Sequence, residues 1–240
     1  MDSVIRLSRV GKTFGDRAIV RDVSFDVPPG RIFGLLGPSG AGKTTVVKMI
    51  AGIESPTSGV VELLGERMPK LSLQTRIGYM AQSDALYSDL TGGENLDFFA
   101  SLYGLRGAAK KRRSDAVLEL VGLSADRGKR VSRYSGGMKR RLSLAVALLH
   151  EPAVLLLDEP TVGIDPLLRR EIWAELERIR ADGTSILVTT HVMDEAEHCD
   201  TLALMRDGAL IAVGTPAELK ASSGASTIEE AFLAYGRAVV

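Results

Sequence analysis

Cysteine is scarce in this chain, and Cys199 is the only one. A disulfide within the chain is therefore impossible, and this usage is typical of proteins in a reducing compartment such as the cytosol. We interpret Cys199 as a small packed or half-exposed side chain rather than a reactive thiol.

Long apolar runs are also missing from the sequence. The most apolar long stretch, residues 142–157, is broken by His150, Glu151 and Pro152, so no segment is expected to span a bilayer. The first residues lack the basic and apolar regions of a signal peptide, and we expect no such signal. Work at a membrane would therefore need a partner that supplies the spanning helices.

Neither sign of charge is in excess. Lys and Arg together number 30, as do Asp and Glu, so the formal net charge is zero. Such a chain has no overall attraction to nucleic acid or acidic lipid, and we expect no nucleic-acid partner. Hydrophobic residues make up 45% and charged residues 25% of 240 positions. These values are typical of a globular protein with one large domain, or one domain with a subdomain.

The most informative feature that is present is a glycine-rich segment that fits the pattern G-x-x-x-x-G-K-[ST]. The backbone N–H groups of such a loop wrap the phosphates of a nucleotide. Lys43 would add a charge at the β- and γ-phosphates, and Thr44 would place a hydroxyl on Mg²⁺. The candidate nucleotide-binding residues are Gly37, Pro38, Ser39, Gly40, Ala41, Gly42, Lys43, Thr44 and Thr45.

The flanking sequence decides between this interpretation and a glycine-rich turn before an ordinary helix. A phosphate loop must follow a strand and open a helix. Residues 31–36 form a short apolar run, as a buried strand requires. Residues 43–51 carry apolar side chains at helical spacing and stop at Gly52. Both conditions hold, so the sequence predicts a phosphate loop.

Strand and helix patterns alternate along the rest of the chain, which indicates an α/β core with a mainly parallel sheet. The helical stretch 86–150 interrupts this core, as an inserted subdomain would; its last helix should begin near Ser135 and run to His150. The basic run Lys110 to Arg113 is interpreted as a solvated helix start or loop rather than a binding patch. The expected strands cover residues 4–10, 23–27, 31–36, 154–157 and 185–189.

The end of the chain carries clear turn and cap signals. Asp207-Gly208 predicts a hairpin between strands at residues 201–205 and 209–213. Thr215 and Thr227 each stand three residues before a glutamate, which predicts a capping box at the start of a helix. The second of these helices is expected to end at Gly236.

Two acids follow the apolar run at residues 154–157. Asp158 can hold Mg²⁺ together with the hydroxyl of a phosphate loop. Glu159 stands one residue further on, where a carboxylate can orient or deprotonate an attacking water. A polar strand end before a turn is the alternative, and the upstream loop around Lys43 favours the catalytic interpretation. His191 follows another predicted strand, where an imidazole could bond the γ-phosphate; a structural role is its alternative.

With these residues in place, the chain resembles the nucleotide-binding subunit of an ATP-binding-cassette (ABC) transporter over residues 4–220. The segment Tyr134 to Met138 resembles the family's signature motif, usually written Leu-Ser-Gly-Gly-Gln. Met138 and Tyr134 depart from that motif, and a methionine cannot make the hydrogen bonds of the glutamine amide. The other residues that match family motifs are Phe14, Gln82, Ser135, Gly136, Gly137, Asp165 and His191.

The resemblance implies an architecture as well as a function. We expect a P-loop NTPase core with a mainly parallel sheet, an N-terminal antiparallel β subdomain and an inserted α-helical subdomain. Within one ABC ATPase domain, the core would be residues 1–85 and 151–220. The helical insert with the signature motif would be residues 86–150, and the C-terminal helix residues 221–240.

The same resemblance assigns roles to single residues. Phe14 would stack on adenine, and Glu159, His191 and Gln82 would be the catalytic set. Gln82 would also join Thr44 and Asp158 as a ligand of Mg²⁺. A further group would bind ATP held by a second, copied or closely related chain, so that two subunits sandwich two ATP molecules head to tail. This group is the start of the signature helix: Ser135, Gly136 and Gly137. Asp165, in the loop after the catalytic acid, is a further candidate nucleotide-binding residue.

The resemblance is to the branch of the family that exports drugs, antibiotics, lipids or polysaccharides. It implies an ATP-hydrolysing motor, peripheral on the cytoplasmic side of the cell membrane, that drives export through a separate permease. Three alternatives remain open at this point: an importer subunit, a soluble cassette acting on a macromolecule, and a nucleotide-binding module without turnover. Glu159 and His191 argue against the last of these.

Overall fold

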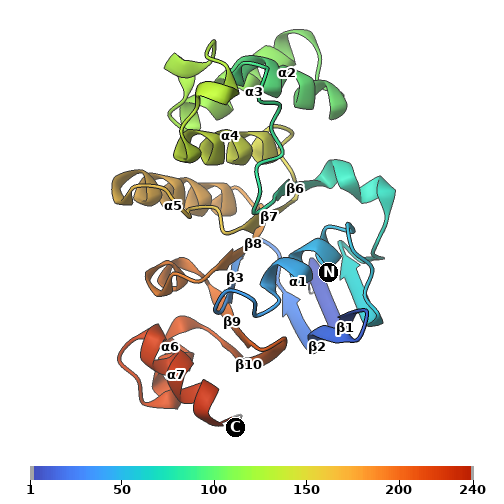
Figure 1. The fold of residues 1–240 in the computed structure, drawn as a ribbon, viewed down its shortest axis with the longest axis vertical. Coiled ribbons are helices and arrows are strands. Elements are labelled where there is room, and N and C mark those ends of the chain that lie inside the picture. The colour runs from blue at the N-terminus through green and yellow to red at the C-terminus, as the bar shows by residue number, and fades with distance from the viewer. Residues whose placement is uncertain (1–2, 239–240) are drawn as a thin grey trace. The chain divides into compact units, whose positions relative to one another are not determined.

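The computed structural model describes residues 3–238 (Figure 1). Packing divides the chain into two compact units, residues 1–71 with 180–240 and residues 72–179. The elements below are described within these units. The family-based division at residues 85, 150 and 220 stays a prediction.

The first unit contains an antiparallel sheet in the order β2-β1-β4-β5. Its strands are β1 (Ile5–Phe14), β2 (Arg17–Val27), β4 (Ser58–Leu63) and β5 (Glu66–Arg67). Ile5 pairs with Val27 on one side and with Leu63 on the other, and all three side chains are buried. This sheet confirms the antiparallel β subdomain. Its first two strands are longer than the apolar alternation predicted.

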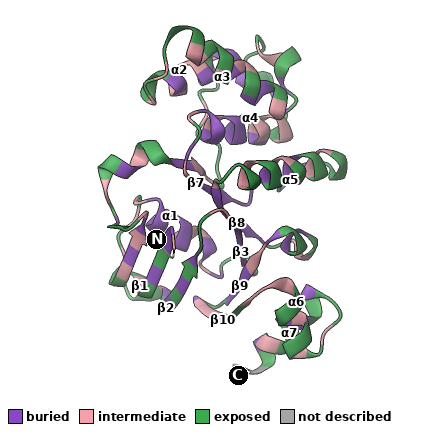
Figure 2. Cartoon of the chain, turned by 180° about the vertical axis from the view of Figure 1, so that it is seen from behind, coloured by how far each residue is buried: buried purple, intermediate pink, exposed green. Residues whose placement is uncertain are grey.

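The same unit contains the parallel strands that carry the phosphate loop. β3 (Ile32–Leu36) pairs in parallel with β8 (Ser185–Thr190) and with β9 (Thr201–Arg206). β10 (Ala209–Gly214) turns back antiparallel to β9 and confirms the predicted hairpin. Every residue of β3 and β8 is buried (Figure 2), which explains why the apolar residues of each strand stand next to one another rather than alternating with polar ones.

Cys199 packs against the back of β3. Its side chain is 4% exposed, and a Cβ added to Gly34 would lie 2.6 Å from its Sγ. Burial raises the pKa of the Cys199 thiol, and the nearby carboxylates of Asp200 and Glu195 raise it further. The prediction of a packed, unreactive side chain therefore fits its surroundings.

The chain ends in α6 (Pro216–Ser223) and α7 (Ile228–Ala238). Thr215 and Glu218 form the predicted capping box at α6. The expected end of the last helix at Gly236 is wrong, because α7 continues to Ala238. Inside this helix, Arg206 Nη1 donates to the Gly236 carbonyl at 3.1 Å, and the same nitrogen would lie 2.6 Å from a Cβ at this position.

The second unit combines a pair of parallel strands with a group of helices. β6 (Ile77–Met80) follows the 3₁₀ turn η1 (Leu71–Arg76) and pairs in parallel with β7 (Val154–Asp158). The helices are α2 (Gly92–Leu102), α3 (Gly107–Leu120), α4 (Gly136–Leu148) and α5 (Pro166–Ala181). The last two residues of α5 are assigned to the first unit. Short 3₁₀ turns, η2 (Ser124–Asp126) and η3 (Val131–Arg133), precede α4. The predicted helical region is therefore present.

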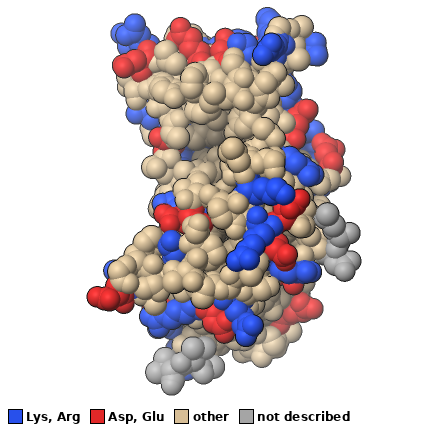
Figure 3. Space-filling view, turned by 90° about the vertical axis from the view of Figure 1, so that its right-hand side faces the viewer, with Lys and Arg blue, Asp and Glu red and all other residues tan. Residues whose placement is uncertain are grey.

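The basic run Lys110 to Arg113 lies in the first half of α3, and its ends are paired within the unit. Lys110 Nζ lies 3.8 Å from the carboxylate of Asp97, and Arg113 donates to the carbonyls of Leu148 and Leu149 at the end of α4. Cationic and anionic side chains are interspersed over the face shown in Figure 3. Between residues 3 and 238, no helix has both the length and the apolar character needed to cross a membrane.

Candidate nucleotide site

The phosphate loop connects β3 to α1 (Lys43–Ile50), as predicted. Two of its glycines are required by the backbone. A Cβ on Gly37 would lie 2.1 Å from the carbonyl oxygen of Met205. Gly42, the residue before α1, has φ +99°, a left-handed value that side chains disfavour. The loop can therefore curve tightly against β9 and present backbone N–H groups at the start of α1.

Lys43 lies in the curve of this loop and is 4% exposed. Its Nζ donates hydrogen bonds to the carbonyls of Gly37 at 2.7 Å and Pro38 at 3.0 Å. Two further bonds hold the loop from outside: Gly208 N donates to the Ala41 carbonyl at 3.2 Å, and Gly37 N to the Thr190 carbonyl at 3.3 Å. The ammonium charge is thus fixed inside a loop that both β8 and the β9–β10 hairpin support.

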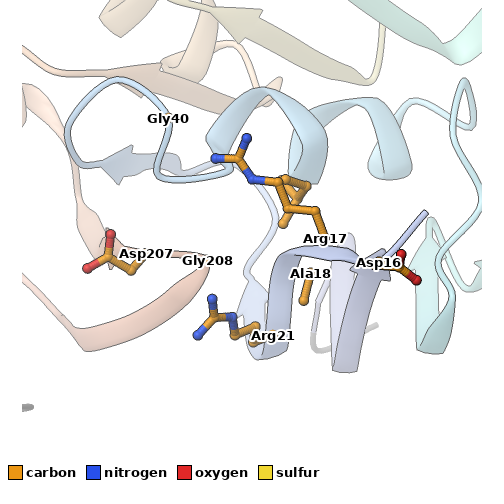
Figure 4. Close-up of a pocket in the computed structure, with 8 residues that line it drawn as sticks. Asp16, Arg17, Ala18, Arg21, Gly40, Asp207 and Gly208 are labelled. Carbon is orange, nitrogen blue, oxygen red and sulfur yellow. The ribbon is translucent and has the colours of Figure 1, made fainter. Parts of the chain in front are cut away.

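A cavity of about 410 Å³ opens beside the loop at Gly40 (Figure 4). Arg17 extends from β2 toward the loop, and Arg21 points toward the turn at Asp207 and Gly208 (Figure 4). Asp16 and Asp207 line the same cavity, so the two guanidinium groups share this edge of the loop with two carboxylates. Sequence reasoning missed both arginines because they belong to no motif.

Phe14 ends β1 with a ring that is 47% exposed. Lys12 Nζ lies 4.7 Å from the centroid of this ring, and it also donates to the carbonyl of Ser55 at 2.8 Å. The ring is therefore held by a cation–π contact and is still accessible. An exposed, positioned aromatic ring is what stacking on a base requires.

His191 directly follows β8 and is exposed. The loop that carries it is fixed by its neighbours: Thr190 Oγ1 donates to the carboxylate of Glu195 at 2.6 Å and accepts from Val192 N at 3.0 Å. Glu195 is 3% exposed, so a buried carboxylate orders the start of this loop. Sequence reasoning missed Glu195, because its contact depends on the turn after β8 rather than on a pattern.

The two acids lie at the end of β7 in the second unit. Asp158 is fully buried as the last residue of the strand, and Glu159 is 8% exposed just beyond it. Glu159 has φ +52°, an uncommon left-handed value for a residue with a side chain. Such strained backbone persists only where surrounding contacts hold it, and it is concentrated at functional sites.

Gln82 lies in the exposed loop after β6. The carbonyls of Gln82 and Glu159 both accept hydrogen bonds from the guanidinium of Arg140 in α4. Within the second unit, the predicted catalytic residues Gln82 and Glu159 are therefore joined through one buried side chain. Sequence reasoning missed Arg140 as well, because it stood only as a basic residue after the signature motif.

The signature motif forms the start of α4. Ser135 is the N-cap, and its Oγ accepts from Met138 N at 3.2 Å. This bond uses the backbone of Met138, so it does not depend on the side chain that departs from the family pattern. Tyr134 is 5% exposed, and its hydroxyl donates to the Asp126 carbonyl at 2.8 Å. That departure is therefore a buried structural residue, and burial raises the pKa of its hydroxyl.

The signature motif and the segment of Asp165 lie close together. A Cβ on Gly137 would lie 3.6 Å from the Gly163 carbonyl. Asp165 caps α5, since its Oδ1 accepts from Leu168 N at 3.1 Å. The second unit thus brings together Ser135, Gly136, Gly137 and Asp165, and the first unit contains Phe14, the phosphate loop and His191.

The comparison with protein families decides the assignment. The family described as ABC transporter matches residues 20–162 of this sequence. The chain belongs to this family. As an ABC cassette, it is similar to curated proteins over nearly its whole length. It is 45% identical over 239 residues to the probable multidrug ABC transporter ATP-binding protein YbhF of Escherichia coli. This match covers 97% of the chain but only 41% of the length of YbhF.

Two other relatives of this ABC cassette are matched over more of their own length. The Nod factor export ATP-binding protein I of Paraburkholderia xenovorans is 43% identical, covering 95% of the chain and 76% of that protein. The linearmycin resistance ATP-binding protein LnrL of Bacillus subtilis is 39% identical, covering 94% of the chain and 73% of that protein. Among solved structures, an ATP-binding subunit of an ABC transporter superposes with a TM-score of 0.89 at 28% identity, covering 98% of this chain and 100% of that one.

The ABC fold includes the predicted P-loop core with its parallel strands, antiparallel β sheet and helices, and this confirms the predicted fold class. The expectation that Thr44, Gln82 and Asp158 hold a magnesium ion, through a hydroxyl, an amide oxygen and a carboxylate, stays a prediction. These are the hard oxygen ligands that Mg²⁺ prefers, so the donor set of this ABC cassette fits the ion. Thr44 lies in the first turn of α1, and Asp158 at the end of β7.

Proposed function

We propose that this chain is the ATP-binding and ATP-hydrolysing motor subunit of an ABC exporter, working with a separate membrane permease. The observation that carries the proposal is the phosphate loop, in which a buried Lys43 ammonium is held by the carbonyls of Gly37 and Pro38. A buried cation inside a ring of backbone N–H groups is a site for the phosphates of a nucleotide. The names of the relatives, two of which mention export or resistance, support export over import.

Each candidate residue has a task in the proposed reaction. The loop from Gly37 to Thr45 binds the triphosphate, and the ring of Phe14 stacks on the base. A bound Mg²⁺ would neutralise charge that develops on the phosphates. Glu159 orients the attacking water through its carboxylate, and His191 bonds the γ-phosphate. Because phosphoryl transfer depends mostly on positioning and electrostatics, the fixed backbone around these residues is part of the mechanism.

We propose further that two chains act together. The N-terminus of α4, with Ser135, Gly136 and Gly137, is an anion-binding element that would meet the γ-phosphate of ATP held by the second chain. A structural relative at 25% identity and a TM-score of 0.82 is described as a dimeric bacterial ABC transporter cassette, which supports this arrangement. Loss of the shared γ-phosphate on hydrolysis would remove contacts from both chains and open the pair.

The permease would dock on an exposed aromatic group at the start of the helical region. Tyr87 and Phe98 are 48% and 38% exposed, and their rings meet edge to face with centroids 4.8 Å apart. Leu102, at the end of α2, is 64% exposed. Tyr87 lies five positions after Gln82, so a movement of the Gln82 segment would be passed to a partner bound on this surface. We place the subunit on the cytoplasmic face of the membrane, held there by the permease.

A Glu159→Gln variant tests the catalytic assignment. The amide keeps the shape of the carboxylate but cannot act as a base, so we expect ATP binding within twofold of the parent and loss of at least 90% of phosphate release. Size measurement in saturating ATP should then show a trapped dimer. Glu151→Gln is the matched control, because Glu151 has a similar left-handed φ of +51° but is exposed before β7. Equal turnover in both variants, or a Glu159→Gln monomer in saturating ATP, would contradict the proposal.

A further inference from the structure

We propose that Arg140 is a positioning residue that couples the catalytic acid to the Gln82 segment, an inference that rests on the proposed function of Glu159. Its guanidinium forms hydrogen bonds with backbone carbonyls of two segments that are far apart in the sequence. Nη1 donates to Ala81 at 2.7 Å and to Gln82 at 2.9 Å. Nη2 donates to Glu159 at 2.6 Å and also to Asp158.

These contacts are made in a buried environment. Arg140 is 6% exposed, and burial lowers the pKa of its guanidinium, while Asp84, Asp158 and Glu159 act in the opposite direction. The carboxylate of Asp84 lies 3.9 Å from Nη1, and Ser143 Oγ donates to it at 2.9 Å. A buried charge with four carbonyl acceptors and nearby carboxylates is strongly held in one position.

The geometry requires an arginine rather than any cation. A planar guanidinium presents donors in a fixed fork, so it can bond two carbonyls with each of two nitrogens. A lysine ammonium is a single point that cannot reach both pairs at once. The same group also supports the left-handed backbone at Glu159, whose carbonyl it fixes. Without the fork, that strained conformation would lose the contact that selects it.

One side chain therefore links three functional segments. Arg140 belongs to α4, the helix that Ser135 caps, and it bonds both the loop of Gln82 and the backbone of Glu159. A shift of the Glu159 backbone when the γ-phosphate leaves would move the guanidinium and, through it, the Gln82 segment. Arg140 would thus carry the state of the nucleotide toward the helical region without touching the nucleotide itself.

Arg140→Lys tests this role, and Arg141→Lys is the matched control. Arg141 is adjacent and also bonds backbone carbonyls, those of Val121 and Gly122, at the end of α3. We expect Arg140→Lys to lower kcat at least tenfold while KM for ATP stays within twofold, because the phosphate loop is intact. Arg141→Lys should keep kcat within twofold. Hydrogen exchange on the nucleotide-free protein should show faster exchange at residues 81–84 and 159–162 in Arg140→Lys alone.

The outcomes separate this inference from the proposed function. If Glu159→Gln abolishes turnover but Arg140→Lys keeps kcat, the role of Arg140 is wrong and the proposed function stands. If Glu159→Gln keeps turnover, the proposed function fails first, and the exchange measurement still reports whether Arg140 holds the two segments. If Arg140 is purely structural, Arg140→Lys should instead lower kcat and Tm together, and hydrogen exchange should be faster throughout residues 72–179.

Discussion

Replacing Lys43 with alanine tests the phosphate loop at its centre. The side chain is buried, and its Nζ bonds two carbonyls at 2.7 and 3.0 Å. Its charge therefore lies in a fixed position inside the loop before any ligand arrives. A nucleotide phosphate would lose this charge-assisted partner in the variant.

The magnitude follows from the bonds that are lost. A hydrogen bond to a charged group contributes about 1.5–3 kcal/mol, and about 1.4 kcal/mol corresponds to tenfold in affinity. Lys43→Ala should therefore weaken ATP binding roughly 10- to 100-fold. Stability should change less. Two carbonyls lose their donor at a cost of about 1–3 kcal/mol, but the variant no longer buries an ammonium, which offsets much of that loss.

The assay is equilibrium titration with a fluorescent ATP analogue, with thermal unfolding measured on the same samples. Lys48→Ala is the matched control, because Lys48 is a half-buried lysine in the last turn of the same helix. We expect the control to bind within twofold of the parent. Lys43→Ala with unchanged affinity, or an equal loss in both variants, would refute the assignment of the loop.

Three further predictions address other parts of the chain. Ser135→Arg should abolish turnover while each monomer keeps its own ATP affinity within about threefold, and an equal loss of both would contradict binding across two chains. Gly37→Ala places a Cβ 2.1 Å from the Met205 carbonyl and should cost about 1–3 kcal/mol in urea unfolding, whereas Gly136→Ala, which meets nothing within 4 Å, should cost much less. Burial, and secondarily the charge of Arg113, lowers the pKa of His150, which accordingly binds fewer protons folded than unfolded. The neutral imidazole therefore stabilises the fold above about pH 6.5, and this stabilisation is lost as the pH falls below that value. His150→Gln should accordingly show a smaller drop in Tm between pH 7.5 and 5.5 than the parent. Equal drops would show that His150 does not cause the loss of stability in acid.

The sequence predicts the buried strands and the helices around the phosphate loop well, because they are decided by local apolar patterns. β1 and β2 extend beyond their alternating parts because the backbone continues to pair where the apolar–polar alternation has stopped, as at Thr13 opposite Ala18. The helix end at Gly236 was wrong for a different reason: Arg206 bonds the Gly236 carbonyl from a distant part of the chain, and no local signal reports that contact.

The residues of the candidate site also differ in whether local sequence patterns predict them. Lys43, Asp158 and Glu159 stand in short patterns that carry their own physical meaning, so the sequence alone points to them. Arg140 and Glu195 do not, because their roles come from contacts that only the folded chain creates. Arg140 bonds a carbonyl 58 positions away in the sequence, and one sequence read by itself offers no signal for such a pair.

The burial of Cys199 has a practical consequence for site-specific labelling of this protein. Since the native thiol is shielded and its pKa is raised, maleimide dyes and spin labels should bypass it. Cysteines introduced on exposed positions of either unit could then be labelled selectively without first engineering a thiol-free background. The distance between two such labels would test whether the proposed pair of chains closes on ATP and opens after hydrolysis.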